Sequence, residues 1–135
     1  MPVSYTHLDV YKRQILGAAI ELKKEGYDPH PEIMVPLTGI LYEFEAQEKV
    51  IRDAAAALFE KEGMEIPFKV GTMIEIPRAA LTANRIASRA EYFSFGTNDL
   101  TQMTFGYSRD DIASFLPVYQ MCIRDSNNIH PPTKM

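Results

Sequence analysis

Apolar residues along the chain alternate between helical spacing and short continuous runs. In residues 15–26 they recur at helical spacing, which predicts a helix with Ile15, Ala19 and Leu22 on its apolar face and a glycine at its end. The next segment, 32–39, is a short apolar run that stops at a proline and a glycine. This pattern is typical of a buried strand followed by a turn.

The same alternation continues through the middle of the chain. Residues 41–63 predict a long helix that ends at a glycine, and residues 68–76 predict a second strand. A helix over 77–90, with proline in its first turn, and a strand over 92–95 follow. Strands that alternate with helices in this way favour an α/β fold with parallel pairing and a sheet covered on both faces.

The spacing of apolar residues also predicts the buried faces of the helices over 41–63 and 77–90. The face of the long helix is predicted to hold Leu41, Phe44, Ile51, Ala55 and Leu58. The face of the next helix is predicted to hold Ala80, Ala83, Ile86, Ala87 and Ala90.

The two ends of the chain differ from this patterned middle. Residues 1–14 and 120–135 show neither helical nor strand periodicity, and their polar mixture changes abruptly at both junctions. We therefore expect non-native segments at both ends, flanking one fragment of a domain over 15–119. Sequencing of the source locus across both junctions tests this hypothesis.

Composition narrows the class of protein without identifying it. A chain of 135 residues with 46% hydrophobic and 24% charged residues is expected to form one domain at most. The charge balance, 14 basic against 18 acidic residues with no basic block, predicts neither a nucleic-acid nor a membrane partner. Cys122 is the single cysteine and no secretory signal is visible, so a cytoplasmic location is the expectation.

Two carboxylates follow the second and third predicted strands. Glu75 ends the second strand and Asp99 comes just after the third, so both are expected at the same rim of a parallel sheet. Two acidic groups at one rim repel each other unless a cation or a shared proton lies between them, and Mg²⁺ takes one or two carboxylates together with substrate oxygens. Gly96, Thr97 and Asn98 add backbone N–H groups, a hydroxyl and an amide. A turn with a helix cap is the alternative interpretation of this segment, and a cap or an arginine partner is the alternative for Glu75.

Two longer motifs make the pattern more specific. The segments "GTMIEIPRAAL" and "FSFGTNDLTQMTFGYSRDD" resemble the PEP-binding barrel of the PEP-utilising enzyme family, and the resemblance extends over about residues 15–119. It implies a partial (β/α)₈ TIM barrel of about three consecutive parallel βα units, with the site at the C-terminal face.

The resemblance also implies roles for individual residues. Glu75 and Asp99 would bind Mg²⁺, and Gly96, Thr97 and Asn98 would join these two in contacting pyruvate or phosphoenolpyruvate. In the family, Mg²⁺ stabilises the enolate of pyruvate while a phosphoryl group passes to or from a phosphohistidine on another domain. The full-length enzyme is then expected to be a homodimer.

Within the family, "TFGYSRDD" favours the branch that converts ATP, phosphate and pyruvate into AMP, diphosphate and phosphoenolpyruvate. There are four alternatives. Three are other enzymes, namely phosphoenolpyruvate synthase, a related lyase, and the enzyme that begins the sugar phosphotransferase system. The fourth is a non-catalytic truncated product. The carrier histidine and the proton-donating cysteine of the family have no counterpart here, since Cys122 lies too close to Asp99 and lacks a glycine-rich setting. We therefore expect no catalytic residue within this fragment and no activity from it alone.

Overall fold

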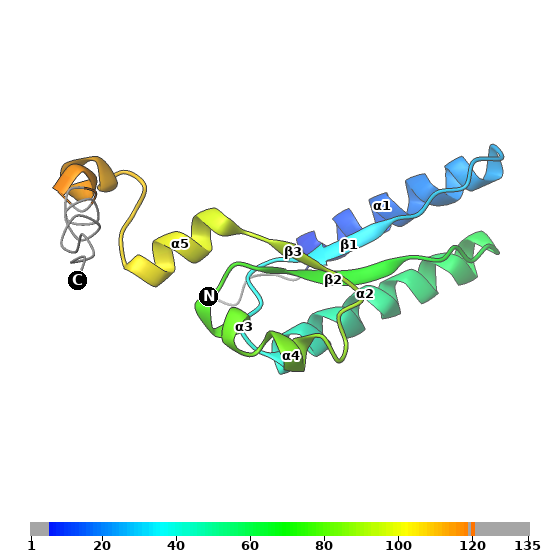
Figure 1. Ribbon diagram of the computed structural model, residues 1–135. Helices are drawn as coiled ribbons and strands as arrows, with labels where there is room; N and C mark the ends of the chain where they lie inside the picture. Colours follow the sequence, from blue (N-terminus) through cyan, green and yellow to red (C-terminus); the bar gives the residue numbers. More distant parts are fainter. Residues whose placement is uncertain (1–5, 119, 121–135) are drawn as a thin grey trace, which may run out of the picture. The chain divides into compact units, whose positions relative to one another are not determined.

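The computed structural model describes residues 6–118 and 120, with side chains from residue 13 onward. Its internal contacts divide the chain into two units, residues 1–100 and 101–135, which are described separately below. Figure 1 shows the order of helices and strands along the chain.

The first unit contains all the strands. Its elements are α1 (Thr6–Lys24), β1 (Glu32–Val35), α2 (Leu41–Glu62), β2 (Lys69–Ile74), α3 (Pro77–Leu81), α4 (Ala83–Ile86), β3 (Phe93–Phe95) and the start of α5 (Thr97–Phe105). The strands form one sheet in the order β1-β2-β3. Both pairings are parallel, so the predicted α/β fold with parallel strands is confirmed.

One face of the sheet packs against α1 and α2, which also contact each other (Figure 1). The register pairs Ile33 with Val70, so these side chains point to the same face, and both are buried. The shared core consists mainly of Leu16, Ala19, Ile20, Ile33, Val35, Phe44, Ile51, Ala55, Ile66, Val70, Ile74, Ala79 and Ile86. The opposite face is less covered, since Met34 keeps 40% of its surface exposed. The prediction of a sheet covered on both faces is therefore wrong at β1.

Helix α1 differs from the prediction in its start and in its buried face. It begins at Thr6, so residues 6–14 are helical although their apolar pattern has no helical period. This segment contains neither glycine nor proline, so none of its residues interrupts the helix. The core takes Leu16 and Ile20, whereas Ile15 and Leu22 remain about half exposed.

The helix predicted over 77–90 is divided into α3 and α4. Thr82 separates them, and its hydroxyl donates to the carbonyl oxygen of Arg78 at 2.9 Å, an interaction that competes with regular helix geometry. The break changes which residues face the core. Ala79 and Ile86 are buried, whereas Ala80 and Ala87, both predicted on the apolar face, are exposed.

Helix α2 carries a buried carboxylate in the middle of its apolar stripe. Glu48 is 3% exposed, and its oxygens accept hydrogen bonds from Arg52 Nε at 2.8 Å and Arg89 Nη2 at 2.9 Å. Arg52 Nη2 also donates to Glu91 at 3.0 Å, and Glu91 accepts the N–H of Val70 at 2.7 Å. This network ties α2 to the segment before β3 and to the start of β2.

The second unit contains the end of α5 and the residues after it. Helix α5 ends at Gly106, whose φ of 71° suits glycine. Tyr107 stacks on Phe105 at a centroid distance of 5.6 Å and meets Phe115 edge-on at 5.1 Å. No helix among residues 6–118 is long and apolar enough to cross a membrane.

We expect the Glu48 network to stabilise the first unit in a pH-dependent way. Burial raises the pKa of Glu48, but the hydrogen bonds from Arg52 and Arg89 outweigh it and hold the pKa below the usual value of 4.5. A lowered folded-state pKa contributes stability above the unfolded-state value and loses it as the pH falls through the folded-state value. Glu48→Gln should therefore lower the free energy of unfolding at pH 7 by about 1–2 kcal/mol, since both arginines are partly exposed.

Urea denaturation between pH 7 and pH 3 measures both effects. The difference between the original chain and Glu48→Gln should shrink below about pH 4.5. Glu45→Gln, an exposed carboxylate on the same helix, is the matched control and should change stability by less than about 0.5 kcal/mol. Equal stability of the two variants at pH 7 would contradict the assignment.

Candidate functional site

The carboxyl ends of the three strands lie side by side and define one rim of the sheet. Ile74 pairs with Phe95, so β2 and β3 end at the same height, whereas Val35, the last residue of β1, pairs with Thr72, two residues before the end of β2. Glu75 is the next residue after β2, and Gly96 is the next residue after β3. The prediction that these two segments share one rim is therefore confirmed by the pairing of β2 with β3.

Glu75 is a buried carboxylate at this rim. It is 5% exposed, and its Oε1 accepts the backbone N–H of Leu37 at 2.7 Å. Leu37 belongs to the turn after β1, so the carboxylate joins the ends of β1 and β2. Within residues 13–118, Glu75 has no ion pair with lysine or arginine, which sets it apart from the doubly paired Glu48.

Gly96 lies directly against Glu75. A Cβ atom at Gly96 would be 2.6 Å from Glu75 Cβ, 2.8 Å from Glu75 Oε2 and 2.8 Å from Met73 Sδ, which is closer than real contacts allow. The backbone of Gly96 also donates its N–H to the carbonyl oxygen of Ile74 at 3.0 Å. Only glycine permits this approach, and Oε2 is the carboxylate oxygen that faces the end of β3.

Thr97, Asn98 and Asp99 form the first turn of α5, and all three are exposed. The carbonyl oxygen of Gly96 accepts the N–H of Leu100 at 3.0 Å, which starts the helix immediately after the strand. An acidic residue and backbone N–H groups thus stand at the positive end of a helix dipole. The structure brings Glu75 and Gly96 into contact and places the other three predicted site residues within one helical turn of Gly96.

The turn after β1 holds site residues that the sequence pattern did not reveal. Thr72 Oγ1 donates to the carbonyl oxygen of Val35 at 2.7 Å, and it lies 2.8 Å from the hydroxyl oxygen of Thr38. Both threonines are almost fully buried. At the other end of the turn, Glu43 Oε2 accepts the N–H groups of Gly39 at 2.8 Å and of Ile40 at 3.2 Å. A threonine inside an otherwise apolar strand was the one available signal for this network.

The donor set of the rim is small. No group of three or more His, Cys, Asp or Glu side chains surrounds a common point in the part of the chain that the structure describes. A protein contribution of two carboxylates fits Mg²⁺, which keeps water and substrate oxygens in its remaining positions, better than it fits Zn²⁺. Cys122 and His130 lie outside the described residues, and His30 is an exposed side chain near Asp28.

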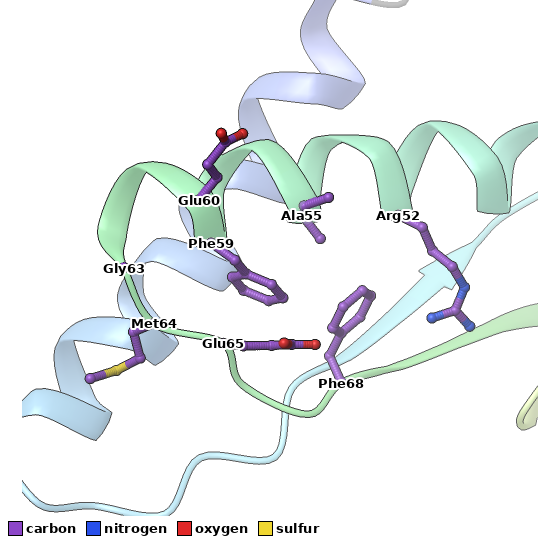
Figure 2. A pocket seen from close by; sticks show the side chains of 9 residues that line it. Arg52, Ala55, Phe59, Glu60, Gly63, Met64, Glu65 and Phe68 are labelled. Carbon is purple, nitrogen blue, oxygen red and sulfur yellow. The ribbon is translucent and has the colours of Figure 1, made fainter.

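A separate cavity of about 530 Å³ lies before the start of β2, between the second half of α2 and the segment 63–68 that follows this helix (Figure 2). Phe59 and Phe68 meet edge-on across it at 6.1 Å, and the Arg52 guanidinium lies 5.6 Å from the centre of the Phe68 ring. Because Phe68 precedes β2 and Glu75 follows it, this cavity is distinct from the rim.

Comparison of the sequence with known proteins assigns the chain to a family. Residues 3–131 match the family model described as "PEP-utilising enzyme, PEP-binding domain". The chain belongs to the PEP-utilising enzyme family. The PEP-binding domain of this family is a TIM barrel, so the predicted partial barrel is confirmed, with the three described strands forming a sheet that is not closed. The match includes most of residues 1–14 and 120–135, whose non-native origin stays a prediction.

Among the curated members of the PEP-utilising family, several pyruvate, phosphate dikinases are similar to the chain. The chloroplastic enzyme of Mesembryanthemum crystallinum is 55% identical over 118 residues, which are 87% of this chain and 12% of that protein. Chloroplastic pyruvate, phosphate dikinase 1 of Oryza sativa subsp. japonica is 57% identical over the same share of each chain. Pyruvate, phosphate dikinase 2 of Zea mays is 54% identical and is covered over 13% of its length. The chain thus spans about one eighth of these relatives.

The prediction of a cytoplasmic location is wrong by this comparison. The relatives from Mesembryanthemum, Oryza and Arabidopsis are chloroplastic proteins by name. The expectation had rested on a single cysteine and the lack of a secretory signal, and neither feature distinguishes one reducing compartment from another.

We expect Gly96→Ala to destabilise the first unit, because the added methyl group would overlap Glu75 and Met73. The free energy of unfolding should fall by about 1–3 kcal/mol. Gly17→Ala is the matched control, since a Cβ at Gly17 meets nothing within 4 Å and alanine is favoured in a helix. Denaturant midpoints of the two variants measure the difference, and a Gly96→Ala chain as stable as Gly17→Ala would show that the close approach to Glu75 is absent.

Proposed function

We propose that the chain is part of the PEP-binding barrel of a pyruvate, phosphate dikinase. The complete enzyme would interconvert ATP, phosphate and pyruvate with AMP, diphosphate and phosphoenolpyruvate. The family match and the names of the relatives support this proposal. Phosphoenolpyruvate synthase and the first enzyme of the sugar phosphotransferase system are the alternatives within the family, and the names of the relatives favour the dikinase over both.

The observation that best supports the proposed site is that the buried Glu75 carboxylate has few compensating partners. A buried carboxylate is costly unless a charge or several hydrogen bonds compensate it. Glu48 receives that compensation from two arginines, whereas Glu75 has one neutral N–H donor among the described residues. A cation supplied with the substrate would complete the environment of Glu75, and Oε2 faces the β3 end, where such a cation would also reach Asp99.

Each residue of the rim has a proposed role. Glu75 and Asp99 would hold Mg²⁺, which when bound supplies positive charge to the enolate oxygen and carboxylate of pyruvate. Thr97 would present its backbone N–H group to the substrate, and Gly96, whose own N–H is bonded to Ile74, would let the substrate approach the backbone closely. The Asn98 amide would donate to an oxygen that becomes more negative during the reaction. These donors sit at the start of a helix that is separated from β3 by the single residue Gly96.

The partners of this site lie outside the chain. Phosphoryl transfer would require a phosphohistidine domain of the complete enzyme, and a homodimer is proposed for that enzyme. Residues 15–119 are proposed as the native part of the barrel, with 1–14 and 120–135 as non-native ends. We propose that the isolated chain is a non-catalytic truncated product, because no histidine lies at the rim among the residues whose side chains the structure describes.

Ligand binding tests the proposed site without requiring activity. Mg²⁺ together with oxalate, a mimic of the pyruvate enolate, should raise the melting temperature of the chain, because a ligand at about 100 times its Kd stabilises the folded state by about 2.7 kcal/mol. Glu75→Gln and Asp99→Asn should each remove this shift. Asp110→Asn, an exposed carboxylate in the second unit, is the control and should keep it. A shift retained in both site variants would show that these carboxylates are not ligands.

We also expect no turnover by the 135-residue chain. Incubation with ATP, phosphate, pyruvate and Mg²⁺ should produce neither AMP nor phosphoenolpyruvate above the level without protein, as measured by chromatography of the nucleotides. Formation of both products in equal amounts would contradict the proposed dependence on a separate phosphohistidine domain.

A further inference from the structure

The turn between β1 and α2 has an unusual backbone conformation at Leu37. Its φ is 55°, the only positive φ of a non-glycine residue among the described positions. A Cβ atom disfavours this conformation, so the surrounding structure must hold it in place. The side chain does not account for it, since Leu37 is 59% exposed and is not part of the core.

The conformation directs the backbone N–H of Leu37 at Glu75. The N–H donates to Oε1 at 2.7 Å, while Oε2 faces Gly96. The two oxygens of the carboxylate therefore have different environments. One is occupied by the turn, and the other is directed toward the end of β3, where Asp99 follows.

The turn is held from both of its sides. On one side, the buried hydroxyls of Thr38 and Thr72 lie 2.8 Å apart, and Thr72 also bonds the carbonyl oxygen of Val35. On the other side, Glu43 accepts the N–H groups of Gly39 and Ile40. These contacts fix Val35, two residues before Leu37, and residues 38–40 directly after it, so the N–H of Leu37 has little freedom to leave Glu75.

We infer that Leu37 is a positioning residue for the proposed metal site, acting through its backbone N–H, and that Thr38 and Thr72 hold it in that role. The inference rests on the proposed function of Glu75 as a metal ligand. By occupying Oε1, the N–H would keep Glu75 from binding a metal through both oxygens and would leave Oε2 as the single donor. Hydrogen-bonded partners of metal ligands commonly change metal affinity by about 10–100-fold when they are removed.

One-oxygen binding at a fixed position favours the small Mg²⁺ ion over the larger Ca²⁺, which accepts two-oxygen carboxylates and flexible geometry. Loosening the turn should therefore change the preference between the two ions as well as the affinity. A residue that only stabilised the fold would alter neither once the protein is folded. The ratio of the Mg²⁺ and Ca²⁺ affinities thus separates positioning from general stability.

The experiment measures binding of Mg²⁺ and of Ca²⁺ by calorimetry in the presence of oxalate, on variants shown to be folded by circular dichroism. Thr38→Val removes the hydroxyl and should weaken Mg²⁺ binding about tenfold and Ca²⁺ binding less. Thr38→Ser keeps the hydroxyl and should behave as the original chain. Leu37→Gly keeps the N–H and favours a positive φ, so it should retain both affinities.

Two results would overturn the inference. One is a folded Thr38→Val chain with unchanged Mg²⁺ affinity and unchanged preference between the ions. The other is a loss of Mg²⁺ binding in Leu37→Gly equal to that in Thr38→Val, which would assign the effect to the leucine side chain. Ser114→Ala, which removes an exposed hydroxyl in the second unit, is the control and should bind both ions normally.

Hydrogen exchange of the Leu37 amide distinguishes this inference from the proposed function. Glu75→Ala removes the acceptor and should speed the exchange of that one amide by at least about tenfold. Unchanged exchange would overturn the positioning role whatever the metal does. In contrast, an original chain that binds no Mg²⁺ with oxalate, but whose Leu37 amide responds to Glu75→Ala, would reject the proposed metal site alone.

Discussion

The burial of the Glu75 carboxylate near the carboxyl ends of the three strands is the constraint on which the structure of the rim depends. Its Oε1 accepts a hydrogen bond from the turn after β1, the carboxylate itself follows β2, and its Cβ and Oε2 touch the glycine after β3. A carboxylate in that place requires a glycine at position 96 and a donor from the β1 turn. Three segments that are far apart in sequence are therefore fitted to one acidic group.

The two buried glutamates of the first unit differ in the partners of their carboxylates. Glu48 and Glu75 are 3% and 5% exposed, so burial alone does not distinguish them. Glu48 is paired with two arginines, and its charge is used within the fold. Glu75 accepts a hydrogen bond from one neutral N–H and directs Oε2 toward the end of β3, and this difference is the reason that we propose Glu75, and not Glu48, as a ligand.

The sequence was sufficient for the order of the three strands and of the helical segments between them, and for the place of Glu75 and Gly96, because these depend on strong patterns. Helix α5 was not predicted. Apolar runs punctuated by glycine and proline define the strands, and a parallel sheet brings their carboxyl ends together whatever the details of packing. The sequence did not predict that α1 buries Leu16 and leaves Ile15 about half exposed. Both residues lie on faces with helical spacing, so tertiary contacts decide which of them is buried. The break at Thr82 and the paired hydroxyls of Thr38 and Thr72 depend on contacts between residues that periodicity does not relate. The positive φ at Leu37 was equally hidden, because leucine gives no local signal for it.

The two ends of β2 make different kinds of contact. The amino end of β2 carries the contacts of Glu91 with Val70 and of Arg52 with Phe68, whereas the carboxyl end carries Glu75. In barrel folds the first of these ends commonly serves stability and the second serves the ligand. Substitutions around Phe68 and Glu91 are therefore the place to seek a more stable variant, with the residues at the carboxyl end of the sheet left unchanged.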